Sequence, residues 1–200
     1  MELALVILVA GLLAVTTAAA REMLATTRAK ALAREMTAVR LAIDGYQDRF
    51  HALPGDDPRA SVHVPGARTA PGAGNGVIDG AWDSADEDLE STLLWQHLRL
   101  AGLMPLAPGD ARPRHVADGV LGASSATPSQ GQVAGIGGFL QVCAGSVSGR
   151  LAKAVDRLLD DGVTDAGTVR VVAQGAPPGS PAIATALIDE GAAYVVCQAY

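Results

Sequence analysis

Residues 21–50, which read REMLATTRAKALAREMTAVRLAIDGYQDRF, decide the fold of this chain. The stretch contains no proline, and its only glycine, Gly45, stands near its end. Apolar side chains recur in steps of three and four, the spacing of one face of an α-helix, whereas Arg28, Lys30 and Arg34 fall outside that face. The apolar stripe comprises Ala25, Ala29, Leu32, Met36, Val39, Ile43, Tyr46 and Phe50. The pattern predicts an amphipathic helix that buries one face against the rest of the protein.

The preceding stretch, residues 3–20, reads LALVILVAGLLAVTTAAA and carries no charged side chain. At about 1.5 Å per residue, a helix of this length is roughly 27 Å long, close to the ~30 Å hydrocarbon core of a bilayer, and this predicts a membrane span. No turn signal separates it from residues 21–50, so we expect one continuous helix from about residue 2 to about residue 51, ending before Pro54. A span followed by a separate core helix is the alternative.

A cleavable secretory signal would also place small residues before Arg21, but such signals begin with Lys or Arg, and this stretch begins with Glu2. Basic residues appear only after the apolar stretch, an order that under the positive-inside tendency would leave the remainder in the cytoplasm. We therefore expect a basic leader upstream of Met1.

Composition bounds the rest of the chain. Its 200 residues allow one domain beyond the long helix, and 23 glycines with 11 prolines indicate a loop-rich one. The formal net charge of -6 argues against a nucleic-acid partner, which needs a basic face. The predicted division is a long N-terminal helix over residues 1–52 and a globular head over residues 53–200.

Cys143 and Cys197 are the only cysteines, and each lies inside an apolar run. No second pair stands near either one, so a zinc site would lack ligands, and we expect no metal centre. Because the globular part is expected outside the cytoplasm, a disulfide between them is the preferred interpretation. Two buried thiols are the alternative.

Residues 51–91 are dense in Gly, Pro and Asp and predict an extended loop. The GAGNG segment at 72–76 does not have the context of a phosphate-binding loop, because no strand precedes it and no Gly-Lys-Ser/Thr follows. Two groups of carboxylates offer the oxygen ligands that Ca²⁺ uses, but the spacing of the first fits no calcium loop, so we expect solvated charges there. The groups are Asp79, Asp83, Asp86 and Asp88, and, as a second place to look, Asp160, Asp161 and Asp165.

Ser84 precedes Glu87 by three residues, the spacing of a capping box, and leucines follow at helical intervals, which predicts a helix over residues 86–101. Trp95 on this helix is expected to pack against the long helix. The histidines have no partners at catalytic spacing, so we expect each to be solvated or satisfied by hydrogen bonds. They are His51, His63, His97 and His115.

A further helix is predicted over residues 148–162, with Ser148 as its N-cap and Gly162 as its stop. Its buried face would consist of Leu151, Val155, Leu158 and Leu159. Strands are predicted at 138–143, 168–174 and 192–200, and residues 104–138 are predicted to be loop. The predicted fold class is α+β, a long N-terminal helix packed on a small, mainly antiparallel sheet with loop-rich connections. Pairing Cys143 with Cys197 would join the first of these strands to the last.

These features together carry a resemblance to a known family. A Glu just ahead of a long apolar helix, its amphipathic continuation, a Gly/Asp-rich loop, a small sheet and a late cysteine pair resemble the type IV pilins and type II secretion pseudopilins. MELALVILVAGLLA is similar to the start of a mature pilin, where one Glu stands in the apolar stretch. YQDRFHALPGDD, GNGVIDG, ESTLLWQHLRLAGL and AVDRLLDDG extend the similarity along most of the chain.

The resemblance implies a role for Glu2. In the family, this Glu is thought to meet the N-terminal amine of a neighbouring subunit when helices pack in the filament core. A carboxylate in a dry core needs a cationic partner, so Glu2 is expected to be an assembly residue. The alternative is an acid that lies in the headgroup layer of a membrane.

The resemblance also implies a function. We expect a structural subunit of a type IV pilus or related pseudopilus, inserted in the bacterial inner membrane and then assembled into an extracellular or periplasmic filament. Its partners would be copies of itself, related pilins and the inner-membrane assembly machinery. No cofactor is expected, and the chain is not expected to be an enzyme, because it offers no nucleophile, base and orienter at recognisable spacing. A membrane-anchored periplasmic binding module that does not form filaments is the alternative.

Overall fold

The computed structural model describes the backbone of residues 2–107, 110–127 and 131–200, and within these ranges the side chains from residue 23 onward. The elements occur in the order α1 (Glu2–Phe50), α2 (Ala60–His63), α3 (Glu90–Leu100), β1 (Leu121–Ser125), β2 (Leu140–Ser148), α4 (Gly149–Leu159), β3 (Val169–Ala173), the 3-10 helix η1 (Thr185–Leu187) and β4 (Ala193–Ala199). The predicted α+β class is confirmed.

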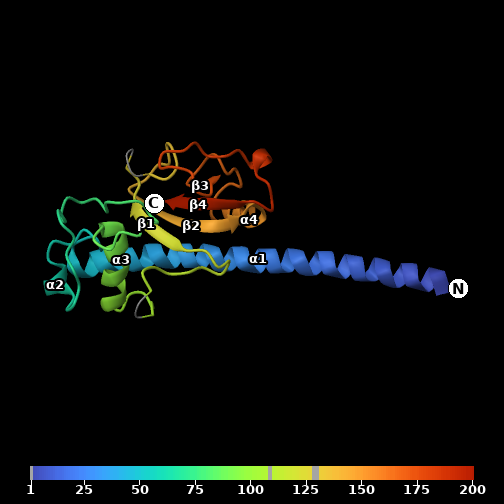
Figure 1. Ribbon diagram of the computed structural model, residues 1–200, viewed down its shortest axis with the longest axis horizontal. Coiled ribbons are helices and arrows are strands. Elements are labelled where there is room, and N and C mark those ends of the chain that lie inside the picture. The colour runs from blue at the N-terminus through green and yellow to red at the C-terminus, as the bar shows by residue number, and fades with distance from the viewer. Residues whose placement is uncertain (1, 108–109, 128–130) are drawn as a thin grey trace.

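Helix α1 is continuous, as predicted, and the alternative of a separate core helix is wrong. Its 49 residues correspond to about 74 Å of helix. The predicted stripe is the buried face: six of its eight members, from Ala29 to Tyr46, are buried, and Ala25 and Phe50 are partly buried. Figure 1 shows that the C-terminal half of α1 lies against the head, whereas the N-terminal half extends beyond it. The helix is therefore both a core element and a projection.

The predicted inner-membrane localisation is contradicted. Among the residues with described side chains, no helix has the length and apolar character needed to cross a bilayer. The described part of α1 is unsuited to a bilayer because it carries charged side chains. Arg28, Lys30 and Arg34 are all exposed within two helical turns. The predicted span at residues 3–20 lies outside the described side chains.

The sheet has four strands in the order β1-β2-β4-β3, and every pairing is antiparallel. Strands β2, β3 and β4 occur close to their predicted positions, but β1 lies in a region predicted to be loop. Its sequence, LGASS, lacks the β-branched and aromatic residues typical of strands. A glycine is required at position 122, because a Cβ there would collide with the backbone carbonyl oxygen of Trp82.

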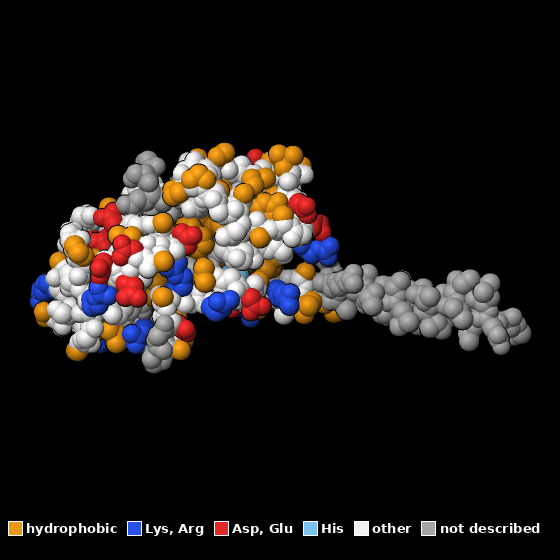
Figure 2. Space-filling view, viewed as in Figure 1, with side chains coloured by type: hydrophobic (Ala, Val, Ile, Leu, Met, Phe, Trp, Pro, Cys, Tyr) orange, Lys and Arg blue, Asp and Glu red, His pale blue; other side chains and the backbone are white. Residues whose placement is uncertain are grey.

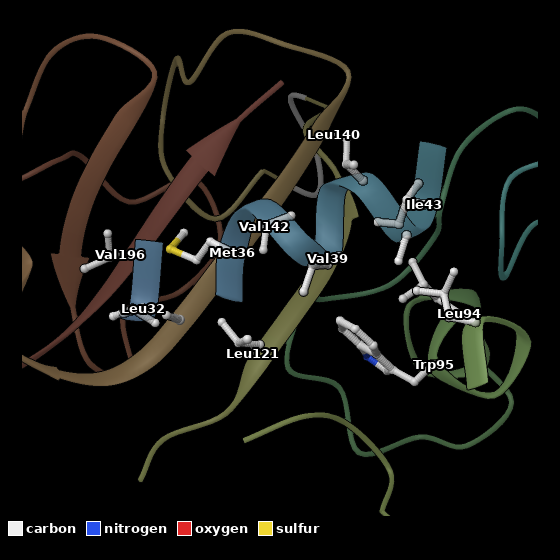
Figure 3. Packing of buried hydrophobic residues seen from close by; sticks show 14 of the residues in the cluster. Leu32, Met36, Val39, Ile43, Leu94, Trp95, Leu121, Leu140, Val142 and Val196 are labelled. Carbon is white, nitrogen blue, oxygen red and sulfur yellow. The ribbon is translucent and has the colours of Figure 1, made fainter. Parts of the chain in front are cut away.

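One face of the sheet packs on α1 and forms the main core. Leu32, Met36 and Val39 of α1 point toward residues of β1, β2 and β4, as Figure 3 shows. Trp95 of α3 is almost fully buried and lies against the same helix, so the prediction for Trp95 is confirmed. The core thus joins the C-terminal half of α1, the sheet and α3.

The two shorter predicted helices are present, with corrections to both. Helix α3 begins at Glu90 rather than residue 86, and the predicted capping box is wrong, since the Ser84 Oγ accepts the Asp86 N–H at 3.1 Å in a local turn. The residues just before Glu90 form turns instead of helix, and Trp82 at the start of this segment packs against β1. In α4, Leu151 and Val155 are buried as predicted, but Leu158 is exposed.

Candidate functional site

Glu2, the predicted assembly residue, is the first residue of α1. Its side chain lies outside the described side chains, so its role in assembly stays a prediction. The part of α1 that carries it is the part that extends from the head in Figure 1.

Cys143 and Cys197 form the predicted disulfide, with an S–S distance of 2.07 Å. They face each other in the register of β2 and β4, and both are fully buried. Their side chains pack with Trp82, Val172 and Val195 in a second apolar cluster, separate from the α1 core. Because successive strand residues point to opposite faces, the disulfide lies on the face of the sheet away from α1.

A cleft of about 760 Å³ lies at the C-terminal end of α1. Its walls are formed by the end of the helix, the segment that follows it through α2, Gly74 and Gly76 of the GAGNG segment, and Phe139. His51 terminates the helix in a left-handed conformation with φ of 54°, and its imidazole is exposed at the cleft. The sequence places the part of this lining between residues 52 and 76 in a loop and does not predict a cleft.

Asp57 is the centre of a buried polar network in the wall of this cleft. The Tyr46 hydroxyl donates to Asp57 Oδ2 at 2.8 Å, His63 Nδ1 lies 2.7 Å from the same oxygen, and the Arg59 N–H donates to Oδ1 at 2.9 Å. Burial alone would raise the pKa of the Asp57 carboxyl, but the hydrogen bonds from His63, Tyr46 and Arg59 outweigh it and lower that pKa. The network therefore holds an ionised carboxylate.

His97 is fully buried and joins α3 to two loops. Its Nδ1 accepts the Gly55 N–H at 2.9 Å, and Nε2 lies 2.7 Å from the Arg68 carbonyl oxygen. Since a carbonyl only accepts, Nε2 carries the proton and the ring is neutral, and burial lowers the pKa of His97 accordingly. The prediction of a hydrogen-bonded histidine holds at this position.

Two more buried acids order the loop beside the cleft. Asp56 accepts backbone N–H groups from Gly74, Asn75 and Gly76, the last two at 3.1 and 2.7 Å. Glu90 accepts the Asp79 N–H at 2.7 Å. Burial raises the pKa of Glu90 to about 7, the Asp79 N–H opposes this rise, and the nearby Asp56 carboxylate adds to it. A glycine is required at position 55, with φ of 92°, because a Cβ there would collide with the Glu90 carbonyl oxygen.

The predicted acidic groups do not form a metal cluster within the described part of the chain, where no three His, Cys, Asp or Glu side chains could hold a metal ion. Asp83, Asp86 and Asp88 are exposed, and Figure 2 shows acidic side chains gathered on the viewed face near the end of the head that carries α2 and α3. In the second group, the Asp160 carboxylate accepts the Val169 N–H at 2.9 Å. Beside it, the buried Asp156 carboxylate makes no hydrogen bond of ordinary geometry, and burial raises its pKa to about 6.

The sequence contains a weak signal for the Asp57 network, the GDDP segment that follows the long helix at residues 55–58. Its pairing with His63 and Tyr46 depends on the turn between α1 and α2 and is not visible in any spacing motif. The described residues that line the cleft include no Ser, Thr or Cys that could act as a nucleophile. Comparisons of the chain with protein-family models, curated proteins and solved structures found no match.

Proposed function

We propose that this chain is a structural subunit of a filament of the type IV pilus or pseudopilus type, assembled by packing α1 of one copy against α1 of others. One observation carries the proposal. Helix α1 is a single element whose C-terminal half belongs to the core of the head and whose N-terminal half extends from it (Figure 1). This shape lets many heads be displayed around a shared bundle of helices.

The sequence of the projecting half supports the same proposal. Residues 3–20 carry no charged side chain, and an apolar segment of this length is unfavourable in water unless another surface covers it. Helices of neighbouring copies offer such a surface. The resemblance of the N-terminus to mature pilins agrees with this arrangement, and the proposed partners are other copies and related pilins.

Glu2 is the residue through which the proposal is tested. In a bundle of apolar helices, its carboxylate would gain a charge-assisted contact with a neighbour's amine and would set the axial register of the helices. Glu2→Leu removes this contact and leaves the head untouched. We expect the variant chain to fold, to form the Cys143–Cys197 disulfide and to give few or no filaments by electron microscopy.

Asp48→Leu is the matched control, because it makes a similar change at an exposed acid in the part of α1 that packs on the head. We expect it to assemble like the unaltered chain. Filaments of Glu2→Leu at normal number and length would contradict the assembly role. A Glu2→Leu chain that fails to form the disulfide would assign Glu2 to folding instead.

A second candidate function is a binding module that does not form filaments, and the cleft at the end of α1 favours it. Sedimentation of the unaltered chain separates the two. The filament proposal predicts large assemblies at raised concentration, whereas a chain that stays monomeric throughout would favour the binding module.

A further inference from the structure

Among the residues that the structure describes, the cleft at the C-terminal end of α1 is lined by none from the projecting half of that helix. It is bounded by α2, which lies at the end of the molecule opposite the projecting half of α1 (Figure 1). A cleft of about 760 Å³ falls in the size range of small-molecule sites. What it could bind depends on which of its polar groups are still available.

The acids of the cleft already have partners. Asp56 and Asp57 are 3% and 0% exposed. Asp56 accepts three of the N–H groups of the GAGNG segment, and Asp57 accepts hydrogen bonds from the Tyr46 hydroxyl, His63 and the Arg59 N–H. Both carboxylates are therefore buried and already hydrogen-bonded within the protein, so neither acid is available to a cation in the cleft.

The arginines of the cleft remain available. Arg49 and Arg59 are exposed, and neither guanidinium makes an ion pair with any residue in the described part of the chain. The Arg49 guanidinium lies over the Phe50 ring at 4.9 Å, and its hydrogen bond to the Ala101 carbonyl oxygen is long at 3.4 Å. Stacking restricts the motion of this guanidinium, which lowers the entropy lost when it binds an anion.

An apolar surface lies beside these cations. Phe139 is 52% exposed, and Pro58, which also lines the cleft, is exposed. An exposed aromatic ring in a cleft loses contact with water when a flat apolar group covers it. The cleft therefore combines two cations without carboxylate partners and an uncovered ring.

We propose that this cleft binds a small organic anion, a carboxylate or phosphate attached to a flat apolar group. Arg49 and Arg59 contact the anion, and Phe139 and Pro58 contact the apolar group. The carbonyl groups at the C-terminal end of α1 carry partial negative charge and therefore disfavour an anion. The positive charge of the stacked Arg49 offsets this effect. This inference does not depend on the filament proposal.

The test is calorimetry on the purified full chain with simple probes. Phenyl phosphate and benzoate represent the two anions, inorganic phosphate lacks the apolar part, and benzylamine reverses the charge. We expect phenyl phosphate or benzoate to bind with a dissociation constant on the order of 1 mM, ordinary for ligands of this size. The tighter of the two identifies the anion. Inorganic phosphate should bind about tenfold more weakly, and benzylamine should not bind.

Variants locate the binding in the cleft. Arg59→Gln should weaken the tighter anion about tenfold, since it removes one charge-assisted contact. Phe139→Ala should weaken that anion but leave inorganic phosphate unchanged. Arg157→Gln, at an exposed arginine on α4, is the matched control and should change nothing.

Several outcomes would overturn the proposal. Benzylamine binding as tightly as benzoate would show that the cleft does not select anions. Equal affinity for phenyl phosphate and inorganic phosphate would show that the apolar surface of the cleft does not contribute to binding. Unchanged affinity in Arg59→Gln, in a variant with an intact disulfide, would place the binding elsewhere on the molecule.

Discussion

Glu90 is a single buried carboxyl whose proton couples stability to pH. It is 3% exposed, and burial raises its folded-state pKa to about 7, above the ordinary value of 4.5 for a glutamate. The native state therefore holds this proton more tightly than the unfolded chain. The stabilisation is complete below about pH 4.5 and is lost as the pH rises through about 7.

Glu90→Gln tests this coupling, because the amide keeps an oxygen to accept the Asp79 N–H and cannot ionise. We expect the unaltered chain to lose on the order of 2 kcal/mol relative to Glu90→Gln between pH 5 and pH 8. Urea unfolding at each pH measures the difference. His97 and Asp156 titrate in both proteins, so only the difference between the two curves reports on Glu90. Curves that run parallel would contradict the buried-proton explanation.

At the scale of one element, α1 is stabilised by its buried stripe rather than by its exposed face. Met36 is fully buried in the main core, whereas Leu41 on the same helix is 64% exposed. Met36→Ala should lower the free energy of unfolding by about 2–4 kcal/mol, the range for a large-to-small change in a core. Leu41→Ala, the matched control, should change it by less than about 0.5 kcal/mol. Chemical denaturation compares the two, and equal losses would show that the stripe is not the main source of stability.

The sheet has its own prediction, which concerns the disulfide between β2 and β4. Peptide mapping without reductant should recover Cys143 joined to Cys197. Replacing both by Ala should lower the free energy of unfolding by about 2–4 kcal/mol, because the unfolded chain gains entropy when the loop between them opens. Free alkylation of both thiols in the native protein would contradict the pairing.

At the scale of the whole molecule, the projecting half of α1 and the head should contribute separately to stability. The buried part of α1 begins at Ala29, so residues 1–22 lie before the first side chain of the shared core. Removing them should leave the free energy of unfolding of the remaining chain within about 0.5 kcal/mol and should abolish assembly. A loss above about 2 kcal/mol would show that these residues also stabilise the head.

The predictable part of this molecule is the part with local periodicity. The stripe from Ala29 to Tyr46 predicts both the helix and its buried face, because a helix of 3.6 residues per turn places these positions together whatever they pack against. Strands β2, β3 and β4 are recognisable for a similar reason, since each contains β-branched residues. The disulfide follows because its two cysteines are the only pair and lie in two of these strands.

The tertiary structure alone decided the rest. Gly122 of β1 must be a glycine because the Trp82 backbone approaches it, and that approach joins segments about forty positions apart. The cleft also depends on tertiary contacts. Asp57 is hydrogen-bonded to Tyr46, His63 and the Arg59 N–H across a turn that no spacing motif specifies. Local periodicity depends on the geometry of one element and can be read along the chain. Burial, pairing and the availability of a charge depend on which distant residues meet, and only the folded chain determines that.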